Sequence, residues 1–198
     1  GTAAELTGFA RAMREMVQPV KVASGGEPLV DTCGTGGDGT STFNISTVAA
    51  FVTAGAGVRV AKHGNRSISG KCGSADLLEA LGVPIALDPA RMALAIETMG
   101  IGFLYAPALN PAMRYAQPAR LELKMRTVFN LLGPLANPAG ASHQLIGAPS
   151  LVAARLMADT LAALGTERAF VVHGSDGLDE ITTTSSTTVF EVQGGVVT

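Results

Sequence analysis

The amino-acid sequence predicts an α/β fold built around a parallel sheet. An apolar strand at residues 29–32 leads into a glycine-rich loop, then a helix of small residues at about 46–56 and a second strand at 58–61. Strand, helix and strand in this order form a βαβ unit, whose two strands are parallel. The alternation recurs between residues 144 and 173, and a chain of 198 residues that is 47% hydrophobic and 15% charged is large enough for a full-sized core.

An amphipathic helix is expected at the start of the chain, over residues 2–17. Thr2 and Glu5 have the spacing of a capping box, in which each side chain accepts a hydrogen bond from the other residue's backbone. Apolar residues recur on one face of this helix, namely Leu6, Phe9, Ala10, Met13 and Val17. Such a face needs a partner surface, which we expect the helices of residues 89–126 to supply.

Local signals place the remaining elements. A helix begins near Ser74, with Asp76 in its first turn and Gly82 just beyond its end. Another helix begins at Asp88-Pro89 and ends at Gly100. The later part of the chain is predicted to contain a strand at 101–105, helical segments at 110–114 and 120–126, a buried turn with two prolines at 130–138, a strand, a helix and a strand at 144–147, 151–164 and 169–173, and a hairpin at 187–192 and 196–197.

Composition and charge exclude several classes of partner. The formal net charge is −2 and the isoelectric point is near 5.9, so there is no basic field for DNA or for an acidic membrane. Aromatic residues make up 5% of the chain and Trp is absent, which leaves few stacking platforms for single-stranded nucleic acid. Cys33 and Cys72 have no metal-type spacing and fit a reducing compartment. With no signal peptide and no apolar run of membrane length, we expect a soluble, cytoplasmic protein.

The glycine-rich loop between Asp31 and Thr47 is the first candidate site. It contains four glycines and several hydroxyl side chains, and a helix begins at its end. Glycine allows positive φ and close approach of N–H groups to a ligand, and a helix start adds free N–H donors. The pattern therefore indicates an anion-binding nest for phosphate or pyrophosphate. It is neither the Walker lysine pattern nor a clean dinucleotide fingerprint, and a plain tight turn is the alternative interpretation.

Two further loops follow predicted strands. The loop from Lys62 to Gly73 carries three cations, an imidazole and two hydroxyls where open α/β sheets place ligands, and it is expected to bind an anion. Lys62 and Arg66 are candidates to neutralise a departing anion. Asp179 and Glu180 follow the strand at 169–173 and offer the hard oxygen ligands that suit Mg²⁺. A solvated turn is the alternative for each loop.

The other reactive side chains have structural interpretations. His63 receives no acid–base role, and His143 and His173 are expected to be structural. Cys33 is expected to be a packed thiol rather than a nucleophile. No residue is assigned as catalytic.

Several motifs together resemble those of the anthranilate phosphoribosyltransferases. The resemblance runs through essentially the whole chain, and its motifs match in order and spacing at residues 31–38, 44–47, 62–67, 130–135 and 176–180. It implies the nucleoside-phosphorylase-like phosphoribosyltransferase fold, in which a small helical domain (residues 1–20 and 89–127) packs on an α/β domain (residues 21–88 and 128–198).

The resemblance also implies an activity. Such an enzyme is a Mg²⁺-dependent glycosyltransferase of tryptophan biosynthesis that transfers the phosphoribosyl group of phosphoribosyl pyrophosphate to anthranilate. The products are N-(5-phosphoribosyl)anthranilate and pyrophosphate, and the expected assembly is a homodimer.

Site residues are carried over by matching positions in these motifs. Phosphoribosyl pyrophosphate would be bound by Gly34, Gly37, Asp38, Thr42, Asn44, Ile45, Ser46, Thr47, Lys62, His63, Gly64, Asn65, Arg66, Ser67, Ile68, Ser69, Gly70 and Ser74. Anthranilate would be bound by Gly34, Asn65 and Arg120. Magnesium would be held by Ser46, Asp179 and Glu180.

The sequence departs from the family pattern at several places. Gly70 stands where the family usually has a second serine, and Lys124 stands where a glycine is usual. The segment 108–115 lacks the histidines that usually precede its proline and follow its arginine, which bears on the acceptor tunnel. Because the family is longer at both ends, the resemblance implies a core portion of such an enzyme.

Three rival interpretations remain at this point. A pyrimidine nucleoside phosphorylase has a similar cationic arm, but phosphorolysis needs no Mg²⁺ pair, so Asp179 and Glu180 argue against it. A non-catalytic relative that binds nucleic acid is opposed by the net charge of −2. An inactive relative that keeps the fold without turnover is the third.

Overall fold

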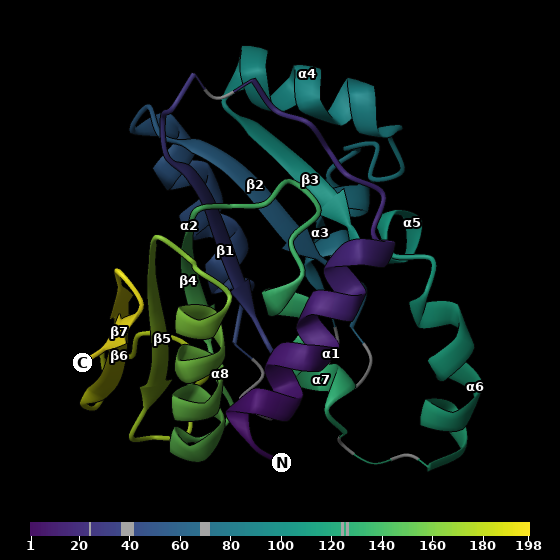
Figure 1. Ribbon diagram of the computed structural model, residues 1–198. Helices are drawn as coiled ribbons and strands as arrows, with labels where there is room; N and C mark the ends of the chain where they lie inside the picture. Colours follow the sequence, from purple (N-terminus) through teal and green to yellow (C-terminus); the bar gives the residue numbers. More distant parts are fainter. Residues whose placement is uncertain (24, 37–41, 68–71, 124, 126) are drawn as a thin grey trace.

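The protein is built on one mixed sheet with helices on both faces (Figure 1). The computed structural model describes residues 1–23, 25–36, 42–67, 72–123, 125 and 127–198. Within these ranges the strand order is β3-β2-β1-β4-β5-β6-β7. The strands are β1 Leu29–Gly34, β2 Arg59–Gly64, β3 Ile101–Tyr105, β4 His143–Gly147, β5 Arg168–Gly174, β6 Thr187–Gln193 and β7 Val196–Val197.

The predicted parallel sheet is confirmed for the first five strands. β1 pairs in parallel with β2 on one side and with β4 on the other, and β3 and β5 extend the sheet in parallel. The expected hairpin forms as β6 and β7, and it joins the same sheet because β6 pairs antiparallel with β5. In the β1–β4 ladder the last pair is Gly34 opposite Gly147. Along the chain, β2 and β3 are added on one side of β1, and β4 and β5 are then added on the other. In open sheets, ligands bind at the carboxyl ends of the strands beside such a reversal.

The helices cover the sheet from both faces. α2 (Ile45–Gly55) contacts β1 and β2, whereas α8 (Leu151–Ala163) contacts β5 and β6. Figure 1 shows α8 and α1 (Ala3–Met16) in front of the sheet and α2 behind it. The remaining helices are α3 Ser74–Ala80, α4 Pro89–Met99, α5 Ala106–Leu109, α6 Met113–Leu123 and α7 Phe129–Leu135. Among the described residues, no helix combines the length and the apolar character that crossing a membrane requires.

The predicted capping signals are present at two helices. At α1, the backbone N–H of Glu5 donates to Thr2 Oγ1 (3.3 Å) and that of Thr2 donates to Glu5 Oε2 (2.7 Å), which is the expected capping box. At α4, the side chain of Asp88 accepts from the first N–H groups and Gly100 ends the helix with φ at 78°. That left-handed conformation favours glycine.

Two sequence expectations about the middle of the chain are wrong in detail. Residues 130–138, expected as a turn, include most of α7, which contains Pro134 inside the helix. The helical segments expected at 110–114 and 120–126 both overlap one helix, α6 (113–123), whereas α5 (106–109) lies where no helix was expected. Residues 124 and 126 lie outside the described residues.

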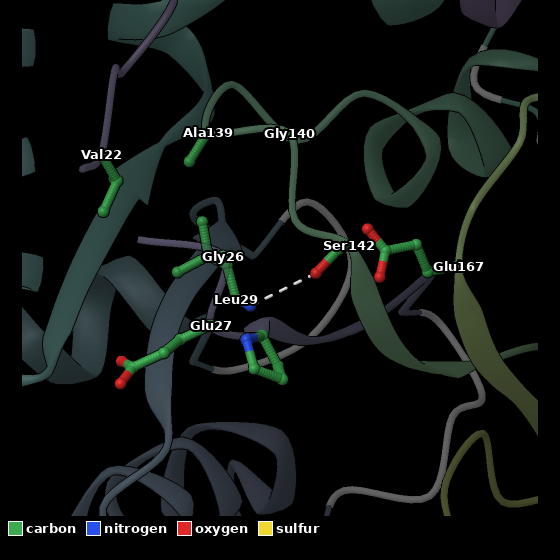
Figure 2. Close-up of a pocket in the computed structure, with 9 residues that line it drawn as sticks. Val22, Gly26, Glu27, Leu29, Ala139, Gly140, Ser142 and Glu167 are labelled. Atoms are coloured by element: carbon green, nitrogen blue, oxygen red, sulfur yellow. Dashed lines mark hydrogen bonds between the residues drawn. The ribbon is translucent and has the colours of Figure 1, made fainter. Parts of the chain in front are cut away.

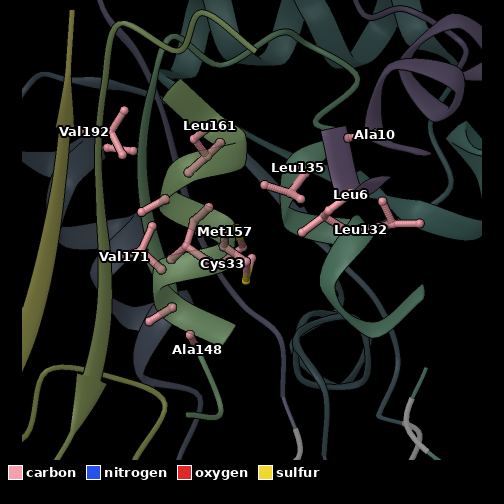
Figure 3. Close-up of a cluster of buried hydrophobic side chains, with 14 of the residues drawn as sticks. Leu6, Ala10, Cys33, Leu132, Leu135, Ala148, Met157, Leu161, Val171 and Val192 are labelled. Atoms are coloured by element: carbon pink, nitrogen blue, oxygen red, sulfur yellow. The ribbon is translucent and has the colours of Figure 1, made fainter. Parts of the chain in front are cut away.

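The apolar face of α1 packs on α8 and α7, not mainly on the helices of residues 89–126 as expected. Leu6 and Ala10 are buried in a cluster with Leu132, Leu135 and Met157 (Figure 3), and Met113 of α6 is partly buried against it. Phe9, expected on the same face, is 50% exposed. The helical hydrophobic period is therefore right, but the partner surface comes from the α/β part of the chain.

Candidate functional site

Three loops meet at the carboxyl edge of the sheet. They follow β1, β2 and β5, which are parallel and lie within four neighbouring strands. The carboxyl ends of parallel strands lie at the same edge, so the glycine-rich loop, the cationic loop and the acidic loop are brought together there. This arrangement is the one that the sequence predicts from the position of each loop after a strand.

The glycine-rich loop contacts the acidic loop directly. The N–H of Gly36, a residue with φ at 67°, donates to Asp179 Oδ2 over 3.0 Å. A Cβ atom on Gly34 would lie 3.5 Å from the same oxygen. The N–H of Thr35 donates to the carbonyl of Gly147 (3.0 Å), which ties the loop to β4. The predicted ligands Gly37 and Asp38 lie outside the described residues.

The start of α2 is fixed from two sides. Thr32 Oγ1 donates to the carbonyl of Ser46 (2.8 Å), and Asn44 Nδ2 donates to the carbonyl of Cys72 (3.2 Å). Ser46 is half-buried, Thr47 is buried and Thr42 is exposed. The first turn of α2, with Ile45, thus lies between β1 and the end of the cationic loop. Its N–H groups at Ile45 and Thr47 donate to the carbonyls of Phe43 (2.8 Å) and Asn44 (3.0 Å).

Lys62 is a buried cation inside the site, not part of an exposed arm. Its side chain is 3% exposed, and Nζ donates to the carbonyl of Thr32 and to Ser46 Oγ, the latter over 3.1 Å. Burial lowers the pKa of Lys62, and the negative charges of Asp31 and Glu180 oppose that shift. The ammonium group therefore links β2 to β1 and to the start of α2.

Asp31 is a buried acid close to Lys62 that is not among the site residues predicted from the sequence. Asp31 accepts from the N–H of His63 (3.0 Å) and from Asn137 Nδ2 (2.8 Å). Burial raises the pKa of Asp31, although the charges of His63 and Lys62 oppose this. The signal in the sequence is a carboxylate within an apolar strand, which indicates a buried acid that needs partners.

His63 and Cys33 have the structural roles expected for them. Burial lowers the pKa of His63, so its imidazole is neutral near pH 7, and Nδ1–H donates to the carbonyl of Gly133 (3.0 Å). Burial raises the pKa of Cys33 well above its usual range, which makes it a poor nucleophile. His143 Nδ1 pairs with Ser142 Oγ (2.9 Å), and His173 Nδ1 with the carbonyl of Ala148 (2.9 Å).

Arg66 of the cationic loop is exposed and ion-paired. Its guanidinium donates twice to Glu79 (2.7 Å each) and once to Asp76 (3.0 Å), and the hydrogen bonds to Glu79 contribute most to raising the pKa of Arg66. The N–H of Arg66 donates to Asn65 Oδ1 (2.7 Å). At the start of this loop, a Cβ atom on Gly64 would lie 2.3 Å from Ser74 Oγ. Three of the predicted ligands, Ile68, Ser69 and Gly70, lie outside the described residues, as does Lys71.

The acidic loop is held by hydroxyl groups and by a glycine of β4. Asp176 accepts from Thr182 Oγ1 (2.6 Å) and Thr184 Oγ1 (2.7 Å), and these bonds lower its pKa. A Cβ atom on Gly147 would lie 1.6 Å from the carbonyl oxygen of Asp179, so strand and loop are in direct backbone contact. Asp179 is 8% exposed and Glu180 is half-buried.

The donor set suits a hard cation bound together with a phosphate ligand. Among the described residues, no group of three or more His, Cys, Asp and Glu side chains gathers as a protein-only metal site. Mg²⁺ does not need one, because it is usually held by one or two carboxylates plus substrate phosphates. Asp179 already lies against the glycine-rich loop through Gly36, so the residues present fit Mg²⁺ bound with a phosphorylated ligand.

Arg120 lies on α6, outside the three loops. It is half-buried, and its guanidinium carbon lies 5.8 Å from the centre of the Phe129 ring at the start of α7. The other two residues expected to meet anthranilate, Gly34 and Asn65, lie at the end of β1 and just beyond β2.

A separate cavity of about 260 Å³ lies at the opposite edge of the sheet (Figure 2). Leu29 begins β1 there, and its N–H donates to Ser142 Oγ (3.3 Å), while Glu167 precedes β5. Because these residues lie at the amino ends of their strands, this cavity is distinct from the candidate site.

The fold and the site together define an α/β protein whose candidate ligand site lies at the carboxyl edge of the parallel strands. A family described as the glycosyl transferase family, a/b domain, matches residues 26–198, and the chain belongs to that family.

Known relatives of the chain have a more specific name than this family. The chain is 68% identical to the anthranilate phosphoribosyltransferase of Solibacter usitatus over 99% of its own length and 58% of the relative's. It is 57% identical to that of Rubrobacter xylanophilus over 98% of its own length and 56% of the relative's. The chain thus spans a little more than half the length of these relatives.

Solved structures give the same result. The anthranilate phosphoribosyltransferase of Thermus thermophilus superposes with a TM-score of 0.88 at 49% identity, over 96% of this chain and 56% of that one. The enzyme of Saccharomyces cerevisiae in complex with PRPP and Mg superposes with a TM-score of 0.87 at 30% identity, over 97% of this chain and 55% of that one. The expected resemblance and fold are confirmed.

Proposed function

We propose that this chain provides the donor-binding core of an anthranilate phosphoribosyltransferase. The reaction is the Mg²⁺-dependent transfer of the phosphoribosyl group of phosphoribosyl pyrophosphate to the amine of anthranilate. One observation carries the proposal: the carboxylate of Asp179 accepts a hydrogen bond from Gly36 in the glycine-rich loop, which puts a metal-ligating group and an anion nest side by side. A phosphate-bound cation needs both at one place.

The relatives support the choice of substrates. The yeast enzyme has been solved with PRPP and Mg and, separately, with 4-fluoroanthranilate, and it superposes on this chain with TM-scores of 0.87 and 0.86. The pair Asp179 and Glu180 favours this reaction over phosphorolysis, which has no use for a magnesium pair.

The proposed site residues have three roles: they hold Mg²⁺, they position a metal ligand, and they bind phosphate. Asp179, Glu180 and Ser46 would hold Mg²⁺, which supplies charge neutralisation at the pyrophosphate oxygens. Lys62 positions Ser46 through its 3.1 Å bond and keeps a positive charge beneath the first turn of α2. The N–H groups of the glycine-rich loop would bind phosphate oxygens.

The chemistry needs positioning more than acid–base catalysis. The bond between ribose C1 and the pyrophosphate oxygen breaks, C1 gains oxocarbenium character, and the amine attacks from the opposite face. The proton that the amine nitrogen loses passes to the departing pyrophosphate or to water. An aromatic amine needs little activation, which agrees with a site where His63 is neutral and buried. The protein contributes orientation and charge stabilisation.

Domain organisation and assembly are part of the proposal. We assign residues 1–20 and 89–127 to a small helical domain and the rest to the α/β domain, in a cytoplasmic homodimer without nucleic acid or membrane partners. The net charge of −2 supports the absence of nucleic acid. Sedimentation equilibrium tests the dimer, and a monomer at every concentration would remove that part of the proposal.

The activity is tested by the loss of anthranilate fluorescence in the presence of phosphoribosyl pyrophosphate, with and without Mg²⁺. We expect fluorescence to fall only when both the donor and Mg²⁺ are present. Calorimetric titration with the donor and Mg²⁺ separates binding from turnover. If the chain consumes a nucleoside in the presence of orthophosphate but does not consume anthranilate in the presence of phosphoribosyl pyrophosphate, a phosphorylase is favoured instead.

Arg120 is expected to bind the acceptor rather than the donor. A guanidinium fork matches a carboxylate in two-pronged geometry, and hydrogen bonds to charged groups contribute about 1.5–3 kcal/mol, or roughly 10- to 100-fold in affinity. Arg120→Ala should weaken anthranilate binding by about that factor and leave donor binding nearly unchanged. Lys62→Ala should do the reverse, because Lys62 lies under the donor loops.

Separate titrations of the two ligands against folded variants measure this difference. Arg91→Ala is the control, since Arg91 lies on α4, is exposed, pairs with Asp88 (3.3 Å) and belongs to none of the predicted sites. Equal weakening of both ligands by Arg120→Ala, or of neither, would show that Arg120 is not an acceptor clamp.

A further inference from the structure

One carboxylate joins the two ends of the cationic loop. Asp76 lies in the first turn of α3, and its Oδ2 accepts from the N–H groups of Ser67 (3.1 Å) and Gly73 (2.8 Å). Its Oδ1 accepts from the guanidinium of Arg66 (3.0 Å). These hydrogen bonds lower the pKa of Asp76, those from Ser67 and Gly73 most of all, so the carboxylate is charged at neutral pH.

The two joined segments are also in close backbone contact. A Cβ atom on Gly73 would lie 2.4 Å from the nitrogen of Ser67 and 2.7 Å from the carbonyl oxygen of Asn65. That carbonyl accepts from the N–H of Ala75 (3.2 Å) and from Ser74 Oγ (3.3 Å). Residues 65–67 and 73–75 therefore fit together only because position 73 has no side chain.

Arg66 takes part in the same contact. Glu79, one turn after Asp76 on α3, accepts both of its hydrogen bonds from this guanidinium at 2.7 Å. The guanidinium carbon also lies 5.9 Å from the centre of the Tyr105 ring. Two carboxylates therefore neutralise the one arginine of the loop, and its fork is already occupied within the protein.

We infer that Asp76 is a positioning residue that holds Asn65 and Ser67 against the start of α3, where Ser74 lies. Arg66 lies beside this brace, and because Asp76 and Glu79 already accept hydrogen bonds from its guanidinium, it is not a phosphate ligand. The inference rests on the proposed function, because these three held residues are expected to meet phosphoribosyl pyrophosphate. It adds one acidic residue, Asp76, to a loop for which the sequence predicts only cations, an imidazole and hydroxyls as site groups.

Asp76→Asn and Glu79→Gln form a matched pair. Each removes one carboxylate charge that faces Arg66, but only the first weakens the acceptor shared by the N–H groups of Ser67 and Gly73. Hydrogen–deuterium exchange of these two amides, without any ligand, is the first measurement. We expect exchange to be about 10-fold faster in Asp76→Asn, which corresponds to the loss of a charge-assisted hydrogen bond, and unchanged in Glu79→Gln.

Donor affinity is the second measurement. Calorimetry with phosphoribosyl pyrophosphate and Mg²⁺ should give a Kd about 10-fold higher for Asp76→Asn and within about 2-fold of the original for Glu79→Gln. Gly73→Ala provides an independent variant, because it separates the same two segments while leaving the carboxylate in place. It should weaken the donor at least as much as Asp76→Asn.

The outcomes separate the two proposals. A folded Asp76→Asn variant with unchanged amide exchange and unchanged donor Kd would overturn the brace. An equal loss of donor affinity in Glu79→Gln would also overturn it, because the effect would then come from the lost charge alone. If the unaltered chain does not bind the donor but the two amides still exchange faster in Asp76→Asn, the brace stands and the proposed function falls.

Discussion

Replacing both Asp179 and Glu180 with alanine is expected to abolish Mg²⁺-dependent binding of phosphoribosyl pyrophosphate. These two side chains are the adjacent carboxylates of the acidic loop, and Asp179 lies against the glycine-rich loop at Gly36. Without them the hard-oxygen ligands from the protein are reduced to the hydroxyl of Ser46. Calorimetry with and without Mg²⁺ measures the loss.

A second double variant controls for the change in charge. Glu15 and Glu167 are exposed and lie outside the candidate site, so Glu15→Ala with Glu167→Ala removes the same charge and should leave donor binding unchanged. Circular dichroism checks that both variants are folded. If the folded Asp179/Glu180 variant still binds phosphoribosyl pyrophosphate with the same dependence on Mg²⁺, these residues are not the metal ligands.

Gly147→Ala is expected to be the most damaging single substitution at the site. The added Cβ atom would lie 1.6 Å from the carbonyl oxygen of Asp179, which is backbone and cannot turn away. Either the end of β4 or the acidic loop must move, and β4 is held there by its ladder to β1. We expect a loss of about 3 kcal/mol or more in the free energy of unfolding, the upper end of the usual cost of overpacking, together with loss of donor binding.

Urea unfolding and donor titration measure these two effects. Gly8→Ala is the control, because a Cβ atom at this position in α1 meets nothing within 4 Å. It should stabilise the chain by about 0.5–1 kcal/mol, since alanine is the better helix former. Normal stability and normal donor affinity in Gly147→Ala would mean that strand and loop are not packed as described.

Much of this architecture follows from local sequence signals. The βαβ pattern predicts parallel strands, and parallel strands bring the loops after β1, β2 and β5 to one edge. The capping residues Thr2 and Asp88 and the terminal Gly100 fix helix ends through interactions within a few residues. Such signals are readable because cause and effect lie close together in the chain.

The errors arise where distant partners decide. Gly133 and Pro134 are turn-forming residues, yet burial of Leu132 and Leu135 against α1 and α8 makes this segment a helix. Periodicity identified the apolar face of α1 but carries no information on its partner. Lys62 shows the same limit, since a lysine in a polar loop gives no sign that it is buried beside Asp31.

The ion pairs of Arg66 are predictable from the sequence of the helix that follows its loop. Asp76 and Glu79 lie three residues apart, so both face the same side of α3 and present two carboxylates to the loop before it. Counting acidic neighbours on the next helix, as well as cations within the loop, would have indicated an internal ion pair.

The central place of β1 also sets the order in which the protein acquires its site. β2 follows β1 closely along the chain, but the pairing of Val30 with His143 joins residues 113 positions apart. At a synthesis rate of about 5–20 residues per second, one edge of β1 waits roughly 6–23 s for its neighbour. An unpaired strand edge is a target for aggregation during that interval. A nascent chain whose synthesis has not reached Glu180 lacks the carboxylate pair, so the donor binding that we propose requires synthesis to pass beyond β5.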